Sequence, residues 1–277
     1  DCVVVITGAA RGQGRAHAVA LAREGAAVGL LDIASGEAEH PPFAVAGRAD
    51  LDAAAAVEAA GGRALPVVCD VRDEDSVVEA VAAVVAAFGG VDHVIVNAGV
   101  ENVFQPTWKI PKEDWDAVFA TNVTGAWLTC KHTVPHLLER APGSSIVMVS
   151  SGAALRPLSW NADYTASKYA VVGLGLTLAN DLGEHGVRVN VICPGAVDTP
   201  MITELARANG ADGSQLTRQF SAAYLLPTER LLRAEESTTP AVLWLLSDEA
   251  RWMTGVVLPV DAGGWVRTAP RRGRGRP

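Results

Sequence analysis

The chain has 277 residues, enough for one large α/β domain and few for two well-developed ones. Hydrophobic residues make up 49% and charged residues 19%, the composition of a globular protein with a sizeable core. The formal net charge of −8 argues against a nucleic acid or an anionic membrane as partner of the body of the protein. Four scattered cysteines without a CxxC pair, and no apolar stretch long enough to span a bilayer, favour a cytoplasmic protein.

Short apolar runs alternate with amphipathic segments along the whole chain. The runs expected to form strands are residues 3–6, 28–31, 65–69, 93–97, 146–150, 187–192 and 256–260. Helical patterns cover residues 15–24, 74–88, 112–140, 162–184 and 239–247. The strands are apolar on both faces, as strands must be when helices cover both sides of a parallel sheet. We therefore predict an α/β fold: a single-domain, doubly wound (Rossmann) parallel sheet of about seven strands with helices on both faces.

Two segments interrupt this alternation. Residues 34–50 are rich in Gly, Pro and Ala and are interpreted as an insertion, and residues 201–232 are interpreted as a substrate lid. The predicted domain covers residues 1–265. The tail at 266–277 holds five arginines among Gly and Pro, which favours a disordered terminus over an electrostatic arm for an acidic partner.

A glycine cluster follows the first predicted strand directly. Its glycines stand at positions 8, 12 and 14, just before the first predicted helix. Glycines at such a turn let the backbone approach a pyrophosphate, and the helix N-terminus presents N–H groups to it. The pattern predicts a dinucleotide site, with contacts from Gly8, Arg11, Gly12, Gln13 and Gly14.

The residue at the end of the second predicted strand bears on the choice of nucleotide. A carboxylate at Asp32 can accept hydrogen bonds from the adenosine ribose hydroxyls and would repel a 2′-phosphate. An arginine in the glycine loop, Arg11, can reach such a phosphate, which keeps NADP open as an alternative. Because Asp32 would lie directly against that phosphate, NAD is favoured.

Polar and small residues follow the next two predicted strands as well. The carboxyl ends of parallel strands meet at one edge of an open α/β sheet, which is where ligands bind. Aspartate after the third strand could bond the adenine amino group, and the small residues after the fourth would let the backbone pass close to the cofactor. The additional expected contacts are Ile33, Asp70, Val71, Asn97, Ala98 and Gly99.

A tyrosine and a lysine mark a candidate site for proton transfer. Tyr164 and Lys168 stand four residues apart in a predicted helix, so they share one face. A tyrosine proton with a pKa of about 10 is held too tightly for efficient transfer at neutral pH. A neighbouring ammonium favours the tyrosinate and lowers that pKa, and we expect Lys168 to do so here. The pair follows the fifth strand and its Ser150 and Ser151, at the predicted cofactor edge.

Taken together, these motifs resemble the short-chain dehydrogenase/reductase family over nearly the whole chain. Residues 7–14 match its TGxxxGxG motif, residues 97–99 its NAG motif and residues 164–168 its YxxxK motif. Ser151 and Asn122 stand where the family has its catalytic serine and asparagine. A proline and a glycine after the sixth predicted strand match its PG motif, and the cofactor contacts implied there are Pro194, Gly195, Val197 and Thr199.

The resemblance implies an enzyme that interconverts a secondary alcohol and a ketone with NAD(H). Tyr164 would act as general acid and base, and Lys168 would bind the nicotinamide ribose. Ser151 would hydrogen-bond the substrate oxygen, and Asn122 would hold a water in a proton relay. Hydride transfer is the task of the nicotinamide, so no catalytic metal is expected. The resemblance also implies a homotetramer with a small-molecule substrate.

A narrower resemblance points to the carveol dehydrogenase-like, mycofactocin-coupled branch of the family. It rests on residues 8–17, on the segment after Asp32, and on residues 248–251 and 254–255. It implies an insertion packed over the adenosine, a tightly retained NAD and a separate redox carrier. The mainly apolar candidates for substrate contact suit a cyclic or terpenoid-like alcohol, and they are Glu101, Val103, Leu155, Trp160, Asn161 and Met201.

Two other functions compete with this one, and one possible metal site has to be considered as well. An NADPH-dependent ketoacyl or polyketide-type reductase is the alternative within the family. A non-catalytic nucleotide-binding scaffold is the alternative outside it, because fold does not fix function. The presence of all four catalytic residue types argues for an enzyme. His132 and His136 stand one helical turn apart, but no third ligand has suitable spacing, so we expect no metal site.

Overall fold

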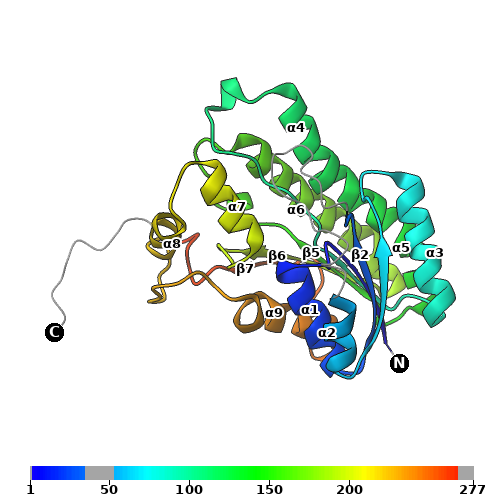
Figure 1. Cartoon of the computed structure of the whole chain (residues 1–277). Helices are drawn as coiled ribbons and strands as arrows, with labels where there is room; N and C mark the ends of the chain where they lie inside the picture. The colour runs from blue at the N-terminus through cyan, green and yellow to red at the C-terminus, as the bar shows by residue number, and fades with distance from the viewer. Residues whose placement is uncertain (1, 35–52, 268–277) are drawn as a thin grey trace.

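Seven parallel strands form one sheet in the computed structural model, which describes residues 2–34 and 53–267 (Figure 1). The strands are β1 (Val3–Thr7), β2 (Ala27–Asp32), β3 (Arg63–Val68), β4 (His93–Val96), β5 (Ser145–Val149), β6 (Arg188–Pro194) and β7 (Val257–Val260). Their order in the sheet is β3-β2-β1-β4-β5-β6-β7. The predicted fold class is confirmed. The chain reverses its direction of winding between β1 and β4, which is where open α/β sheets bind ligands.

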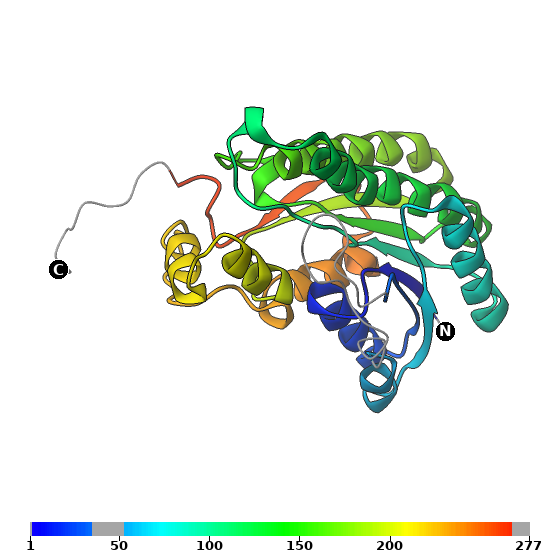
Figure 2. The ribbon, with the colours of Figure 1, turned by 45° about the horizontal axis from the view of Figure 1, so that its top comes forward.

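Helices cover both faces of the sheet (Figure 2). One face carries α1 (Gly12–Arg23), α2 (Ala53–Ala59) and α9 (Thr238–Leu246). The other carries α3 (Glu74–Phe88), α4 (Lys112–Phe119), α5 (Gly125–Arg140) and α6 (Ala162–Leu182). The insertion expected at 34–50 lies outside the described residues from 35 onward, and the tail expected at 266–277 lies outside them from 268 onward.

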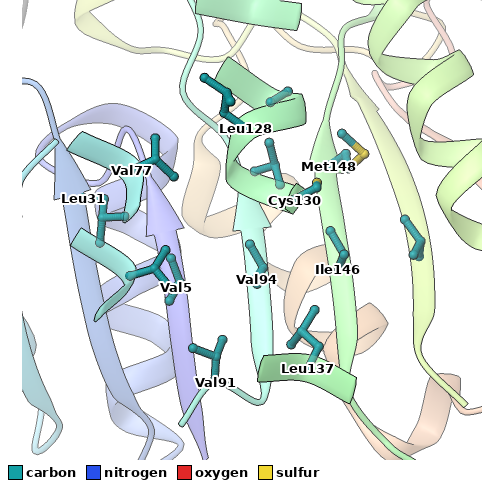
Figure 3. Close-up of a cluster of buried hydrophobic side chains, with 14 of the residues drawn as sticks. Val5, Leu31, Val77, Val91, Val94, Leu128, Cys130, Leu137, Ile146 and Met148 are labelled. Atoms are coloured by element: carbon teal, nitrogen blue, oxygen red, sulfur yellow. The ribbon is translucent and has the colours of Figure 1, made fainter. Parts of the chain in front are cut away.

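The hydrophobic core is divided by the sheet into two clusters. Alternate residues of β1 point to opposite faces: Val3 and Val5 join the cluster under α3, α5 and α6, whereas Val4 and Ile6 join the one under α1 and α9. Figure 3 shows the first cluster, in which Val5 of β1 lies between Leu31 of β2 and Val94 of β4, with Ile146 of β5 beyond Val94. The strands β1, β2, β5 and β6 are buried along their whole length and consist mainly of apolar runs, as the sequence indicated, whereas the edge strand β3 is partly exposed.

Two stretches contain local structure that the sequence analysis did not expect. The segment at 112–140 is divided by a π-helical turn, Ala120–Thr124, between α4 and α5. Such turns often occur at functional sites, and this one contains Asn122. The segment at 201–232, expected as a lid, contains α7 (Pro200–Ala208) and α8 (Gly213–Ser221). Pro200 stands in the first turn of α7, where its missing N–H costs nothing.

The described helices include none that is both long enough and apolar enough to cross a membrane.

Candidate active site

A cleft runs along the carboxyl edge of the sheet, from the glycine loop after β1 to the first turn of α7. The predicted site residues that line it are Gly8, Arg11, Gly12, Gln13, Asp32, Ile33, Asp70, Val71, Asn97, Ala98, Gly99, Tyr164, Lys168, Thr199 and Met201. Lining residues that the sequence analysis did not name include Arg72, Val100, Thr121 and Pro200. The cleft therefore joins the predicted nucleotide site to the predicted proton-transfer site.

The glycine loop requires glycine at each of the three expected positions. Gly8 and Gly12 have φ angles of +65° and +56°, which disfavour any side chain. A Cβ on Gly14 would lie 2.1 Å from the carbonyl oxygen of Gly8. The backbone is thus tightly turned, and α1 begins at Gly12 with its N-terminus at the cleft. This geometry fits a pyrophosphate.

Asn97 stabilises this loop from β4. Its Nδ2 donates to the carbonyl oxygens of Thr7 at 2.9 Å and Gly8 at 3.0 Å. The hydroxyl of Thr7 accepts from the backbone nitrogens of Asn97 at 3.0 Å and Ala98 at 3.1 Å. Asn97 therefore supports the glycine loop as well as lining the cleft.

Asp32 lies at the carboxyl end of β2 with only 8% of its surface exposed. Its Oδ2 accepts a hydrogen bond from the backbone nitrogen of Ala10 at 3.0 Å. Burial raises the pKa of Asp32, while backbone N–H groups and the positive charge of Arg11 oppose that rise. A carboxylate held here fits the ribose-binding role expected from the sequence.

Asp70 has a partner that the sequence analysis did not consider. Its carboxylate accepts hydrogen bonds from Nε of Arg72 at 2.9 and 3.0 Å, and from Nη2 at 2.7 Å. Burial raises the pKa of Asp70, but the hydrogen bonds from Arg72 outweigh it and the net pKa is lowered. Asp70 and Arg72 lie in the turn between β3 and α3, outside any helix or strand, so no regular repeat of the sequence pairs their side chains.

Three of the predicted catalytic residues meet at the other end of the cleft. Lys168 is 4% exposed; its Nζ donates to the carbonyl oxygen of Val149 at 3.1 Å and lies 5.6 Å from the centre of the Tyr164 ring. The side chain of Ser151 favours the ionised form of the Tyr164 hydroxyl and so lowers its pKa. The Oγ of Ser151 also accepts from the backbone nitrogen of Ala153 at 3.1 Å, which holds the serine in place.

The ionisation of Tyr164 differs from the expectation. Burial raises the pKa of its hydroxyl, the charge of Glu101 raises it further, and the side chain of Ser151 lowers it. The net pKa is raised, so the lowering that the sequence analysis expected from Lys168 is wrong. Burial also lowers the pKa of Lys168 to about 8, against the opposing charge of Glu101. Desolvation is a property of the folded site that residue spacing does not report.

Asn122 is fully engaged within the protein. Its Oδ1 accepts from the backbone nitrogen of Val100 at 2.8 Å, and its Nδ2 donates to the Val100 carbonyl and to Oγ of Ser167, both at 2.9 Å. A Cβ on Gly99 would lie 3.1 Å from Nζ of Lys168 and 3.3 Å from Oδ1 of Asn122. The structure brings Asn122 to the catalytic group, and its role in a water relay stays a prediction.

The residues predicted after β6 connect the sheet to α7. Pro194 ends β6, and the backbone nitrogen of Gly195 donates to the carbonyl of Val260 in β7 at 3.0 Å. Val197 is buried and pairs with Leu232 in an isolated bridge. Thr199 stands at the N-cap position of α7 and lines the cleft. The cofactor contacts expected of these four residues stay predictions.

The six candidates for substrate contact fall into different environments. Met201 lines the cleft, and Leu155 packs against the core under α6. Glu101 and Asn161 are 5% and 1% exposed, and Nδ2 of Asn161 donates to Oε1 of Glu101 at 2.9 Å. This buried hydrogen bond connects the segment after β4 to the segment before α6, and the predicted contacts of Glu101 and Asn161 with substrate stay predictions.

Trp160 lies on the segment before α6, and Val103 lies on the segment after β4. Trp160 is 61% exposed with a φ of +62°, and its carbonyl accepts from the backbone nitrogen of Gln105 at 2.8 Å. Val103 is half-buried on the segment after β4. The predicted contacts of Trp160 and Val103 with substrate stay predictions.

The two histidines considered as metal ligands have other contacts. Nε2 of His132 lies 2.9 Å from Oε1 of Glu74, and Nδ1 of His136 lies 3.6 Å from Oε2 of Glu139. In residues 2–34 and 53–267, no three or more His, Cys, Asp or Glu side chains are grouped to hold a metal ion.

Comparison with known proteins identifies a family and several relatives that the chain resembles. The short chain dehydrogenase family matches residues 2–210. An NAD-dependent oxidoreductase of Mycobacterium tuberculosis is 41% identical over 266 residues, 94% of each chain. The (−)-trans-carveol dehydrogenase of Rhodococcus erythropolis is 40% identical over 267 residues, covering 94% of this chain and 96% of that one.

A solved structure agrees with these relatives. Carveol dehydrogenase from Mycobacterium avium, crystallised in complex with NAD, superposes with a TM-score of 0.89 at 35% identity, covering 96% of this chain and 98% of that one. The match extends through the glycine loop, the sheet and the tyrosine helix, so the chain belongs to the short-chain dehydrogenase family.

Proposed function

We propose that the protein is an NAD-dependent oxidoreductase that interconverts a secondary alcohol and a ketone. The observation that carries this proposal is one continuous cleft with a nucleotide-binding edge and a proton-transfer group. The glycine loop and Asp32 lie at one end, and Tyr164 and Lys168 lie at the other, with Ser151 acting on the pKa of the tyrosine. A scaffold that only binds nucleotides has no need for the second group.

The residues of the cleft fit NAD. The turned glycine backbone and the N-terminus of α1 would hold the pyrophosphate, and the buried carboxylate of Asp32 would accept from the ribose hydroxyls. The same carboxylate would repel a 2′-phosphate, which argues against the NADPH-dependent alternative. When bound, the nicotinamide supplies the hydride acceptor or donor. Thr199 and Lys168 are placed to hold its end of the dinucleotide.

The side chains of the protein then have two tasks, which are to transfer one proton and to stabilise the charge that develops on the substrate oxygen. In ketone reduction, the Tyr164 hydroxyl gives its proton to the carbonyl oxygen, and its raised pKa keeps that proton in place beforehand. Ser151 donates to the same oxygen as charge develops on it. In alcohol oxidation, Tyr164 must first lose its proton, and the ammonium of Lys168 stabilises the tyrosinate that results.

We also propose a cyclic or terpenoid-like substrate and a place in the carveol dehydrogenase-like, mycofactocin-coupled branch. The similarity to two carveol dehydrogenases supports the substrate class and the carveol dehydrogenase-like branch. In that branch the NAD would be tightly retained and re-oxidised by a separate redox carrier. The segment containing α7 and α8 would act as the substrate lid of a single domain, because Thr199, Pro200 and Met201 line the cleft.

We further propose a homotetramer located in the cytoplasm. This assembly is the one that the resemblance to the short-chain dehydrogenase/reductase family implies. The four free cysteines are compatible with a reducing compartment.

The experiment that tests the function replaces the proton-transfer group. Tyr164→Phe should lower kcat at least about a thousandfold, because it removes the transferred proton. It should leave the Kd for NAD nearly unchanged, since the ring remains. Tyr169→Phe is the matched control, because Tyr169 stands on the same helix but is 46% exposed, and it should retain full turnover. Unchanged turnover in Tyr164→Phe would overturn the proposed mechanism.

A further inference from the structure

An ion pair joins the glycine loop to the first helix of the lid. Nη1 of Arg11 lies 3.1 Å from Oε1 of Glu204, and Nη2 lies 3.5 Å from Oε2. The two side chains are 29% and 17% exposed, so water screens them only in part. Arg11 directly precedes α1, and Glu204 is in the second turn of α7, which lies beside α1 in Figure 2.

Arg11 is the residue of this loop that could serve NADP. It lines the cleft with Asp32, and its charge lowers the pKa of the Asp32 carboxyl against the effect of burial. The guanidinium is therefore close to the carboxylate that faces the ribose. Arginine binds phosphate well because its planar donors match two oxygens at once.

Glu204 competes for those same donors. Turning Arg11 toward a 2′-phosphate would break the ion pair and leave the half-buried Glu204 carboxylate without that cation. With the pair intact, the carboxylates of Asp32 and Glu204 both act on the Arg11 guanidinium.

We propose that Glu204 is a specificity-determining residue: by holding the Arg11 guanidinium against α7, it withholds Arg11 from a ribose 2′-phosphate and favours NAD over NADP. The inference rests on the proposed NAD-dependent function and adds a residue on the lid, 193 positions from the arginine it controls. Glu204 acts through Arg11, so it is a positioning residue rather than a catalytic one.

Nucleotide displacement tests this without recourse to turnover. Bound NADH is displaced by adding NAD and, in a separate titration, NADP, and its fluorescence is followed. The two titrations give the ratio of the affinities for NAD and NADP. Glu204→Gln should improve the affinity for NADP relative to NAD about fivefold, the size expected for releasing one partly exposed ion pair. Glu204→Asp keeps a carboxylate and should stay within about twofold of the wild-type ratio.

Two further variants separate the proposed route from a general effect of charge. Glu229→Gln removes a negative charge from an exposed position of the lid and should leave the ratio unchanged. In an Arg11→Ala background, Glu204→Gln should have no further effect, since the residue through which it acts is gone. The inference is overturned if Glu204→Gln leaves the ratio unaltered, if Glu229→Gln alters it equally, or if the effect persists without Arg11.

The same titration distinguishes this inference from the proposed function. A wild-type protein that binds neither NADH nor NAD overturns both. A wild-type protein that prefers NAD, with a ratio that Glu204→Gln does not change, overturns the role of Glu204 and leaves the proposed function standing.

Discussion

At the scale of single residues, Glu101 is the group that most alters the catalytic pair. It lies on the segment after β4, is 5% exposed and accepts from Nδ2 of Asn161 at 2.9 Å. Burial raises its pKa to about 7, while Asn161 and Lys168 oppose that rise and Asp163 adds to it. Its charge in turn raises the pKa values of Tyr164 and Lys168. With a pKa of about 7, the carboxyl group of Glu101 changes its protonation state near neutral pH.

This coupling predicts a displaced pH profile for Glu101→Gln. The variant keeps an oxygen that can accept from Asn161 but cannot carry a negative charge, so the Tyr164 proton becomes easier to remove. The rise of kcat/KM for alcohol oxidation with pH should move to lower pH by at least about half a pH unit. Glu79→Gln, an exposed position on α3, should not move it. A profile that scales down without moving would mean that Glu101 is only structural.

At the scale of elements, the end of α9 depends on a residue of β6. The last carbonyls of a helix have no partner within it. Here Nη1 of Arg188 donates to the carbonyl of Leu245 at 2.6 Å, and Nη2 donates to those of Leu246 at 3.2 Å and Ser247 at 3.3 Å. Arg188 is 8% exposed, and its positive charge also suits a helix C-terminus. One side chain thus fastens α9 to the sheet.

Replacing this arginine should destabilise the fold. Arg188→Met fills similar space but leaves several buried carbonyls unsatisfied, and should reduce the free energy of unfolding by about 3 kcal/mol in urea titrations. Arg251→Met, at an exposed position just beyond α9, should change it by less than about 0.5 kcal/mol. Equal stabilities of the two variants would contradict the capping role.

At the scale of the whole molecule, α7 is held over the cleft from two sides. Arg11 ties its middle to the glycine loop. At its end, Oδ1 of Asn209 accepts from the backbone nitrogen of Phe104 at 2.9 Å, and Nδ2 donates to the carbonyl of Leu205 at 2.8 Å. Segments far apart in the chain thereby meet at one site.

Native mass spectrometry can examine retention and assembly in a single measurement. The proposed homotetramer should appear at four times the 28.8 kDa of the chain, with up to four NAD molecules carried through purification and dialysis. A nucleotide-free tetramer would contradict tight retention, and a monomer would contradict the proposed assembly. Asp32→Ala removes the ribose contact and should lose the nucleotide while the assembly persists.

The sequence by itself determined the α/β fold, the parallel sheet and the positions of the nucleotide and tyrosine motifs. Strand runs such as residues 3–6, apolar on both faces, have no other stable place than a sheet covered on both sides. The backbone of one turn requires the glycines at 8, 12 and 14, and a turn of this kind can be predicted from a short stretch of sequence.

Only the tertiary structure decided the electrostatics of the site. The pairing of Arg11 with Glu204, the burial of Glu101 and the net rise of the Tyr164 pKa all depend on which distant segments meet. Charges interact through space and through the dielectric that surrounds them, and neither distance nor burial is written in residue spacing. The sequence names the chemical groups, whereas packing determines their charge states and partners.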